Sequence, residues 1–162
     1  MLSERQLTDL ARQAANRLRD LNLKLVLAES CTGGLISSVL TENSGASKYF
    51  LGSVVSYANQ AKHDLLGVPE KVLRTQGAVS KETASLMVKG ARKVLQADWS
   101  VSVTGIAGPT GGAPLKPVGL VFLAVAGPGF VKVKKKIFRG SRKKIQRQAA
   151  QAALALLLKN LK

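Results

Sequence analysis

Small nucleophilic side chains follow a short apolar run near the start of the chain. The stretch Ala28-Glu29-Ser30-Cys31-Thr32-Gly33-Gly34 comes directly after Leu25-Val26-Leu27, and an apolar, helix-like segment follows it. The pattern predicts a buried strand that turns sharply into a helix. The first backbone N–H groups of a helix lack partners and lie at the positive end of its dipole, so they can hold an anion or an oxyanion. The turn is therefore a candidate site for chemistry on a phosphorylated or acyl substrate.

Ser30 and Cys31 are the candidate nucleophiles of this turn, and we expect only one of them to face a pocket. His63 is the one histidine of the chain, and its polar surroundings favour a surface residue over a catalytic base. A serine can instead be activated by a lysine that burial keeps neutral. Lys62 is the candidate, five residues beyond Tyr57 at the end of a predicted strand, and Tyr57 could share its protons or position a substrate. The alternatives are a helix N-cap for Ser30, a solvated position for Lys62 and a packing role for Cys31.

A glycine-rich loop follows another predicted strand. Its sequence, Thr104-Gly105-Ile106-Ala107-Gly108-Pro109-Thr110-Gly111-Gly112, matches neither the Walker A pattern nor Gly-x-Gly-x-x-Gly. Its backbone N–H groups and the Thr104 hydroxyl could still contact a substrate, and a purely structural crossover loop is an equal alternative.

Arg142 opens the last predicted helix, where a cation is unfavourable to the helix dipole. This placement suggests a bound anion nearby, and an exposed arginine without a role is the alternative. One histidine, one cysteine and scattered acidic residues form no cluster at metal-ligand spacing. We therefore expect neither a metal nor a cofactor.

The elements that must position these groups alternate between strand and helix in the first half of the chain. The apolar patterns predict helices over 3–21, with Ser3 as N-cap, and over 32–40, 59–66, 80–95 and 141–159, and strands over 24–28, 51–57, 98–103, 118–126 and 130–138. Such alternation indicates a parallel sheet, and the short turn between the last two strands makes them antiparallel. The expected fold class is α/β. Residues 1–162 would form a single three-layer α/β/α domain with a mixed, mostly parallel sheet and a C-terminal antiparallel hairpin.

Charge is distributed unevenly along the 162 residues. The net charge is +16, all nine acidic residues lie in 1–98, and 99–162 hold twelve Lys and Arg without an acid. Such an excess attracts nucleotides and nucleic acid. Nine cations are concentrated in one basic run: Lys132, Lys134, Lys135, Lys136, Arg139, Arg142, Lys143, Lys144 and Arg147. Lysines on a solvated strand face also protect an edge from aggregation without any ligand. Aromatic side chains, on which bases could stack, make up only 4% of the chain, so nucleic-acid binding is possible but not favoured.

Hydrophobic content and cysteine usage limit the classes of protein to which this chain can belong. Hydrophobic residues make up 46% of the chain, and no apolar run approaches the roughly 20 residues of a membrane span. The single cysteine permits no internal disulfide. We therefore expect a cytoplasmic protein with a substantial core and no membrane partner.

Six motifs, in order, are similar to those of the CinA C-terminal domain family. They are Ala28-Glu29-Ser30-Cys31-Thr32-Gly33-Gly34, Gly45-Ala46-Ser47, Ser56-Tyr57-Ala58-Asn59-Gln60-Ala61-Lys62, Gly77-Ala78-Val79-Ser80, the loop from Thr104 to Gly112, and Lys116-Pro117-Val118-Gly119. The similarity extends over roughly residues 5–158.

The resemblance implies an activity and roles for the candidate residues. Family members include amidohydrolases that convert nicotinamide mononucleotide (NMN) to nicotinate mononucleotide and ammonia without a metal. The resemblance assigns Ser30 as nucleophile and Tyr57 and Lys62 as proton-handling residues. It also implies a homodimer. The substrate-binding residues would be Thr32, Gly33, Gly34, Thr104, Gly105, Ala107, Gly108 and Arg142, with oxyanion donors among the glycines and a phosphate contact at Arg142. A catalytically silent nucleotide- or nucleic-acid-binding domain of the same fold is the alternative.

Overall fold

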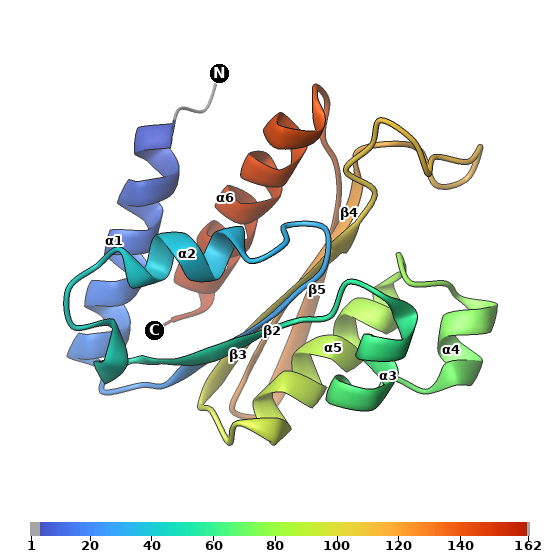
Figure 1. The fold of residues 1–162 in the computed structure, drawn as a ribbon. Helices are drawn as coiled ribbons and strands as arrows, with labels where there is room; N and C mark the ends of the chain where they lie inside the picture. The colour runs from blue at the N-terminus through green and yellow to red at the C-terminus, as the bar shows by residue number, and fades with distance from the viewer. Residues whose placement is uncertain (1–3, 162) are drawn as a thin grey trace.

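A central sheet separates two layers of helix in the computed structural model, which describes residues 4–161 (Figure 1). The strands are β1 (Leu25–Glu29), β2 (Phe50–Val55), β3 (Trp99–Gly105), β4 (Leu120–Gly127) and β5 (Phe130–Ile137). The helices are α1 (Glu4–Asp20), α2 (Leu35–Thr41), α3 (Asn59–Leu66), α4 (Glu70–Thr75), α5 (Lys81–Val94) and α6 (Arg142–Asn160), with a short 3-10 helix, η1 (Ala46–Lys48).

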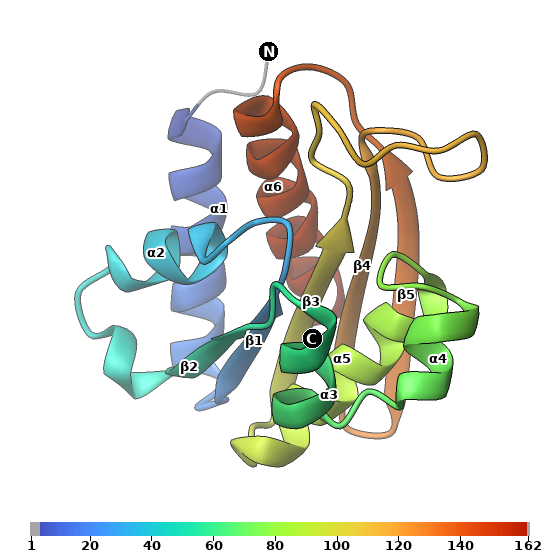
Figure 2. The same ribbon diagram turned by 45° about the vertical axis from the view of Figure 1, so that its right-hand side comes forward.

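The sheet is mixed, and its strands lie in the order β2-β1-β3-β4-β5. Strand β1 pairs in parallel with both β2 and β3, whereas β4 is antiparallel to β3 and to β5. Four of the five strands therefore run in one direction, as the matching arrows of β3 and β5 show (Figure 2). The carboxyl ends of β1, β2 and β3 meet at one end of the sheet, which confirms the predicted α/β class.

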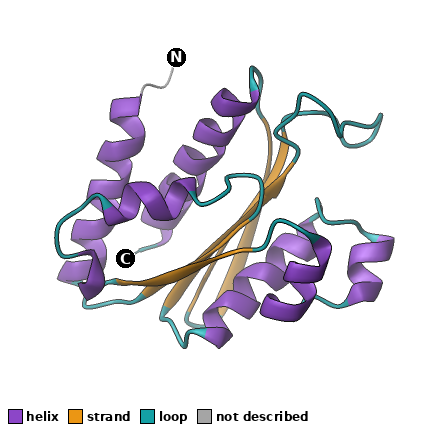
Figure 3. Ribbon diagram, viewed as in Figure 1, coloured by secondary structure: helices purple, strands orange, loops and turns teal. Residues whose placement is uncertain are grey.

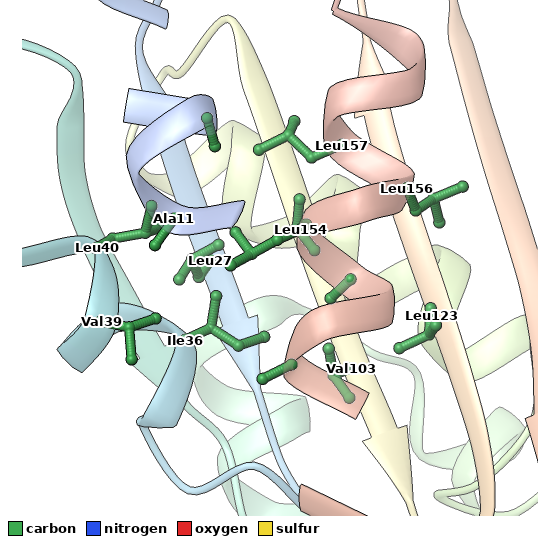
Figure 4. Packing of buried hydrophobic residues seen from close by; sticks show 14 of the residues in the cluster. Ala11, Leu27, Ile36, Val39, Leu40, Val103, Leu123, Leu154, Leu156 and Leu157 are labelled. Carbon is green, nitrogen blue, oxygen red and sulfur yellow. The ribbon is translucent and has the colours of Figure 1, made fainter. Parts of the chain in front are cut away.

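The larger apolar core lies on the face covered by α1, α2 and α6. Alternate residues of the strands point into it, such as Leu27 of β1, Val103 of β3 and Leu123 of β4. They meet Ile36 of α2 and Leu154 of α6 (Figure 4). This packing fixes where β1 ends and where α2 begins, and the candidate turn lies between these two points.

Small side chains bring α5 close to the opposite face. The Ser100 and Ser102 hydroxyls of β3 donate to the α5 carbonyls of Val88 and Ala84, both at 2.7 Å. Helix α5 in turn supports α3. A Cβ at Gly90 would lie 2.0 Å from the Leu66 carbonyl oxygen, so the two helix backbones are in contact there.

Three local predictions are wrong. Helix α2 begins at Leu35 rather than at 32, because Gly33 (φ 61°) and Gly34 (φ 98°) adopt left-handed conformations that end the turn. Strand β2 ends at Val55, so Tyr57 lies in the loop before α3. Strand β4 begins at Leu120 rather than at 118, and α4 and η1 were not predicted at all, because each spans only a turn or two.

One of the two predicted helix caps is confirmed, and the other cannot be placed. The proposed N-cap Ser3 lies outside the described residues, whereas the Ser80 side chain caps α5 by accepting from the Thr83 amide at 3.1 Å. Among residues 4–161, no helix is long and apolar enough to span a membrane.

Candidate active site

The carboxylate of Glu29, at the end of β1, organises the turn that carries Ser30. Glu29 is buried and accepts six hydrogen bonds. Three come from the backbone amides of Gly34, Ile36 and Ser37 at 2.9–3.1 Å, and three from the hydroxyls of Thr32, Ser37 and Ser53 at 2.7–3.4 Å. A carboxylate at a helix N-terminus satisfies its free amides and its dipole. The anion held by the start of α2 is therefore a side chain of the protein itself.

This geometry corrects the predicted role of the two glycines. The Gly33 amide donates to the Ser30 carbonyl at 3.1 Å, and the Gly34 amide donates to Glu29. The Thr32 hydroxyl also donates to Glu29. Thr32, Gly33 and Gly34 thus shape the turn, and the Thr32 hydroxyl and the two glycine amides are already engaged within the protein.

Ser30 and Lys62 meet at the carboxyl end of β1. The Lys62 amine donates to Ser30 Oγ at 3.1 Å and to the backbone carbonyls of Ser56 and Tyr57 at 2.7 and 3.0 Å. Both side chains are buried, and Lys62 is 0% exposed. The serine is fixed in turn, because its amide donates to the Val103 carbonyl of β3 at 3.0 Å.

Burial changes the chemistry of Lys62. No carboxylate pairs with its amine among the described residues, since the one ion pair there joins Arg12 and Asp9. Desolvation therefore lowers the pKa of Lys62 to about 8, with the neighbouring Cys31 opposing the shift. About a tenth of Lys62 is then neutral at pH 7, and about half at pH 8, which supplies the unprotonated form that a general base requires.

Cys31 is buried beside this pair. Burial is the main cause that raises the pKa of its thiol to about 12, so the thiol stays protonated. It packs in the core and also borders the pocket together with Ser30, contrary to the expectation that only one of them would do so. Because the Cys31 thiol stays protonated and Ser30 is the residue that contacts Lys62, Cys31 fits the predicted packing role.

Tyr57 and Arg142 form the rim of the site, and they interact with each other. Arg142 donates to the Tyr57 hydroxyl at 2.8 Å and to the Gly108 carbonyl at 2.9 Å. The Tyr57 side chain is 60% exposed, and only its backbone carbonyl contacts Lys62. The phenol thus contacts Arg142 and not the Lys62 amine, and the proton-handling role of Tyr57 stays a prediction.

The loop after β3, which projects from the end of the sheet in Figure 3, completes the wall. The Thr104 hydroxyl donates to the Ala78 carbonyl at 2.7 Å, so its oxygen can only accept from a further group. Gly105 and Ala107 border the pocket, and the Ala107 amide donates to no other group among residues 4–161. Gly108 contributes the carbonyl that receives Arg142.

These groups enclose a pocket of about 180 Å³. It is bordered by Ser30, Cys31, Tyr57, Lys62, Ala78, Val79, Thr104, Gly105, Ala107 and Arg142. The structure thus brings together a buried serine, a buried lysine, a free backbone amide and a rim arginine. His63 is not among them, because its Nδ1 lies 2.9 Å from the Val68 carbonyl, on the other side of α3. Within the described chain, no group of three His, Cys, Asp or Glu could hold a metal.

Residues 7–161 match the CinA C-terminal domain. The chain belongs to the CinA C-terminal domain family. It is 49% identical over 134 residues to a CinA-like protein of Anaeromyxobacter dehalogenans, which covers 83% of this chain and 33% of that protein. It is 56% identical over 119 residues to a CinA-like protein of Synechococcus sp., and this match covers 74% of this chain and 28% of that protein. The chain thus spans about a third of the length of these relatives.

Solved structures of the family have the same fold. The competence/damage inducible protein CihA of Agrobacterium tumefaciens superposes with a TM-score of 0.92 at 42% identity, covering 95% of this chain and 94% of that one. The competence damage-inducible protein A of Klebsiella pneumoniae gives a TM-score of 0.93 at 30% identity, with 96% of both chains covered.

Some contributors to the site of this CinA-family domain were missed by sequence reasoning. Glu29 was seen only as part of a motif, although five of its six donors lie within eight positions of it, because the pattern alone does not show that the carboxylate folds back over the start of α2. Ala78 and Val79 were within a recognised motif but received no role in the site. The carbonyls of Ser56 and Tyr57 leave no signal in the sequence, since every residue has one.

Proposed function

We propose that this CinA-family domain is an amidohydrolase that converts NMN to nicotinate mononucleotide and ammonia. The contact of 3.1 Å between the Lys62 amine and Ser30 Oγ, both buried and without a carboxylate partner, carries the proposal. The family resemblance supports the choice of a carboxamide substrate, and the geometry supports a serine nucleophile with a lysine base.

In the first half of the reaction, Ser30 Oγ bonds to the carboxamide carbon while its proton moves to Lys62. Two N–H bonds of the amine are directed to the Ser56 and Tyr57 carbonyls, so the lone pair of neutral lysine is left for the Ser30 proton. The C–N bond then breaks, and Lys62 returns the proton to the nitrogen, which leaves as ammonia.

In the second half, water attacks the ester carbon and gives a proton to Lys62. The bond to Ser30 Oγ breaks, and Lys62 returns the proton to Oγ as the product leaves as a carboxylic acid, which gives its own proton to water and becomes nicotinate. Negative charge develops on the former carbonyl oxygen in both halves. We assign its stabilisation to the unpaired Ala107 amide at the pocket wall.

The pocket holds only part of a mononucleotide. Its volume of about 180 Å³ is below the roughly 300 Å³ or more of pockets that enclose a whole drug-sized ligand. The nicotinamide ring would lie inside, where the Thr104 oxygen can accept from the carboxamide NH₂. The ribose phosphate would extend to the rim, beside the guanidinium of Arg142.

Turnover of NMN by a serine variant tests the proposal. Ammonia and nicotinate mononucleotide are measured for the wild type, Ser30→Ala and the control Ser38→Ala, which alters an exposed serine of α2. We expect Ser30→Ala to lower kcat by about 10³-fold or more and Ser38→Ala to leave it unchanged. Turnover that survives Ser30→Ala, or no turnover by the wild type, contradicts the proposal.

The homodimer and the cytoplasmic location stay predictions. Sedimentation of the purified chain tests the first, and fractionation of the cells that produce it tests the second.

A further inference from the structure

Strand β5 presents a row of lysines on one face of the sheet's edge. The pairing of β5 with β4 places Lys132, Lys134 and Lys136 opposite Val125, Leu123 and Val121, so all three lysines point to the face that carries α6. The odd-numbered residues Val131 and Val133 point to the α5 face and pack there. We call these three side chains the lysine row.

The lysine row is open and unpaired. Lys134 and Lys136 are exposed and Lys132 is half-buried. Strand β5 forms the edge of the sheet farthest from β2 (Figure 2). The one ion pair among the side chains of residues 5–161 is Arg12–Asp9, and no acidic residue occurs after Asp98. The charge of the row is therefore neutralised by no carboxylate of the described chain.

Protection of a sheet edge does not account for this charge. Lysines on edge strands prevent strand-to-strand aggregation. The opposite edge strand of the same sheet, β2, has the sequence Phe-Leu-Gly-Ser-Val-Val and carries no charged side chain at all. The molecule thus leaves one edge without charge and concentrates cations on the other.

We propose that the lysine row binds double-stranded nucleic acid through its phosphates, without reading the sequence. Residues two apart in a strand lie about 6.8 Å apart, so the row extends for about 14 Å along one line. A duplex carries one charge per roughly 1.7 Å of its axis, which gives such a row several phosphates to contact. Positive charge continues past the row in the exposed residues Arg139, Lys143 and Lys144, where the chain crosses to the α6 face.

The chemistry of this face favours a duplex over other polyanions. A single strand needs aromatic faces on which bases can stack. The aromatic residues at the two ends of the row are engaged in packing, Phe130 against the ring of Trp99 and Phe138 against the core. Membrane-surface helices add to the attraction between cations and anionic lipid by inserting apolar side chains, and the lysine row has none on its face.

Binding of a fluorescent 20-base-pair DNA duplex to the full chain, followed by anisotropy from 25 to 200 mM NaCl, tests the proposal. The row variant carries Lys132→Gln, Lys134→Gln and Lys136→Gln. The control carries Lys48→Gln, Lys71→Gln and Lys81→Gln, which remove the same charge from exposed positions outside β5 and α6. We expect the row variant to weaken binding at least tenfold at 50 mM NaCl. We also expect it to reduce the slope of log K against log[NaCl] by about 2–3.

Several outcomes would overturn the proposal. An equal loss of affinity in the control variant would mean that net charge alone drives binding. Tighter binding of a single strand of the same length would contradict the choice of a duplex. Row-dependent binding to phosphatidylserine vesicles without binding to DNA would assign the row to a membrane. None of the substituted lysines borders the pocket, so ammonia release from NMN should be unchanged in the row variant. If the wild-type chain does not hydrolyse NMN at all, that result contradicts the proposed function and leaves the test of nucleic-acid binding unaffected.

Discussion

Glu29 and Lys62 are buried ionisable side chains with different kinds of neighbours. Six donors lie within 3.4 Å of the Glu29 carboxylate, although the Ser37 hydroxyl shares its one proton with the Gly34 carbonyl. The Lys62 amine has two carbonyls and one hydroxyl, and no anion. The first arrangement stabilises a charge and holds a turn in place. The second destabilises a charge, and in the proposed mechanism it yields a base, so we assign positioning to Glu29 and proton transfer to Lys62.

Glu29 is therefore a positioning residue, and Glu29→Gln should slow the reaction without touching the substrate. The variant places an NH₂ group among donors, so we expect the free energy of unfolding to fall by about 2–4 kcal/mol. We expect kcat to fall by about 10-fold or more with little change in KM, because the turn that holds Ser30 loosens. Steady-state kinetics at a temperature where the variant is fully folded check this.

Ser53→Ala serves as the control for Glu29→Gln. It removes only the longest of the six hydrogen bonds, 3.4 Å, and should lower stability by less than about 1 kcal/mol. A folded Glu29→Gln variant with wild-type kcat would contradict the positioning role.

At the scale of elements, the position of α3 decides whether Lys62 reaches Ser30. Helix α3 rests on α5, and the closest approach is at Gly90, where a Cβ would be 2.0 Å from the Leu66 carbonyl oxygen. Leu66 lies one turn beyond Lys62 on the same helix. The absence of a side chain at position 90 thus sets the depth at which the lysine enters the site.

Gly90→Ala should destabilise the protein, although alanine favours an isolated helix by about 1 kcal/mol over glycine. The added Cβ forces α3 away from α5, and overpacking of this kind costs about 1–3 kcal/mol. We also expect kcat to fall, because Lys62 moves with α3. Thermal unfolding and ammonia release test both effects, with the exposed neighbour Lys89→Ala as control. A Gly90→Ala variant that is more stable than the wild type would show that the helices can separate freely.

Elements were predictable from local patterns, whereas contacts between them were not. The apolar run of β1 and the Ser80 cap of α5 are short-range signals, and both predictions were confirmed. The Ser30–Lys62 contact spans 32 positions and the Arg142–Tyr57 contact 85, and each depends on how helices settle on the sheet. Sequence therefore identified candidate residues but could not tell that Tyr57 would contact Arg142 with its hydroxyl and Lys62 with its carbonyl.

At the scale of the whole molecule, unbalanced charge opposes folding. The net charge is +16, and the described residues contain a single ion pair. Like charges repel most in the compact state, and salt screens them over about 8 Å at physiological ionic strength. The excess positive charge is thus expected to lower stability at low ionic strength.

The melting temperature should consequently rise with salt. Between 10 and 300 mM NaCl we expect an increase of about 2–4 °C, equivalent to about 1 kcal/mol of relieved repulsion. The variant with glutamine at positions 132, 134 and 136 has three fewer positive charges and should show a smaller increase. Calorimetry or circular dichroism provides the measurement. A melting temperature that falls as salt is added would mean that attractive pairs outweigh repulsion.

The pH dependence of kcat/KM for ammonia release from NMN tests most directly whether neutral Lys62 activates Ser30. The lysine must be unprotonated to act as a base, and its pKa is lowered to about 8. We predict that kcat/KM rises about tenfold per pH unit below pH 8 and levels off above it, and that Lys62→Met abolishes turnover. A rate that is independent of pH between 6 and 9, or one that persists in Lys62→Met, would contradict the mechanism.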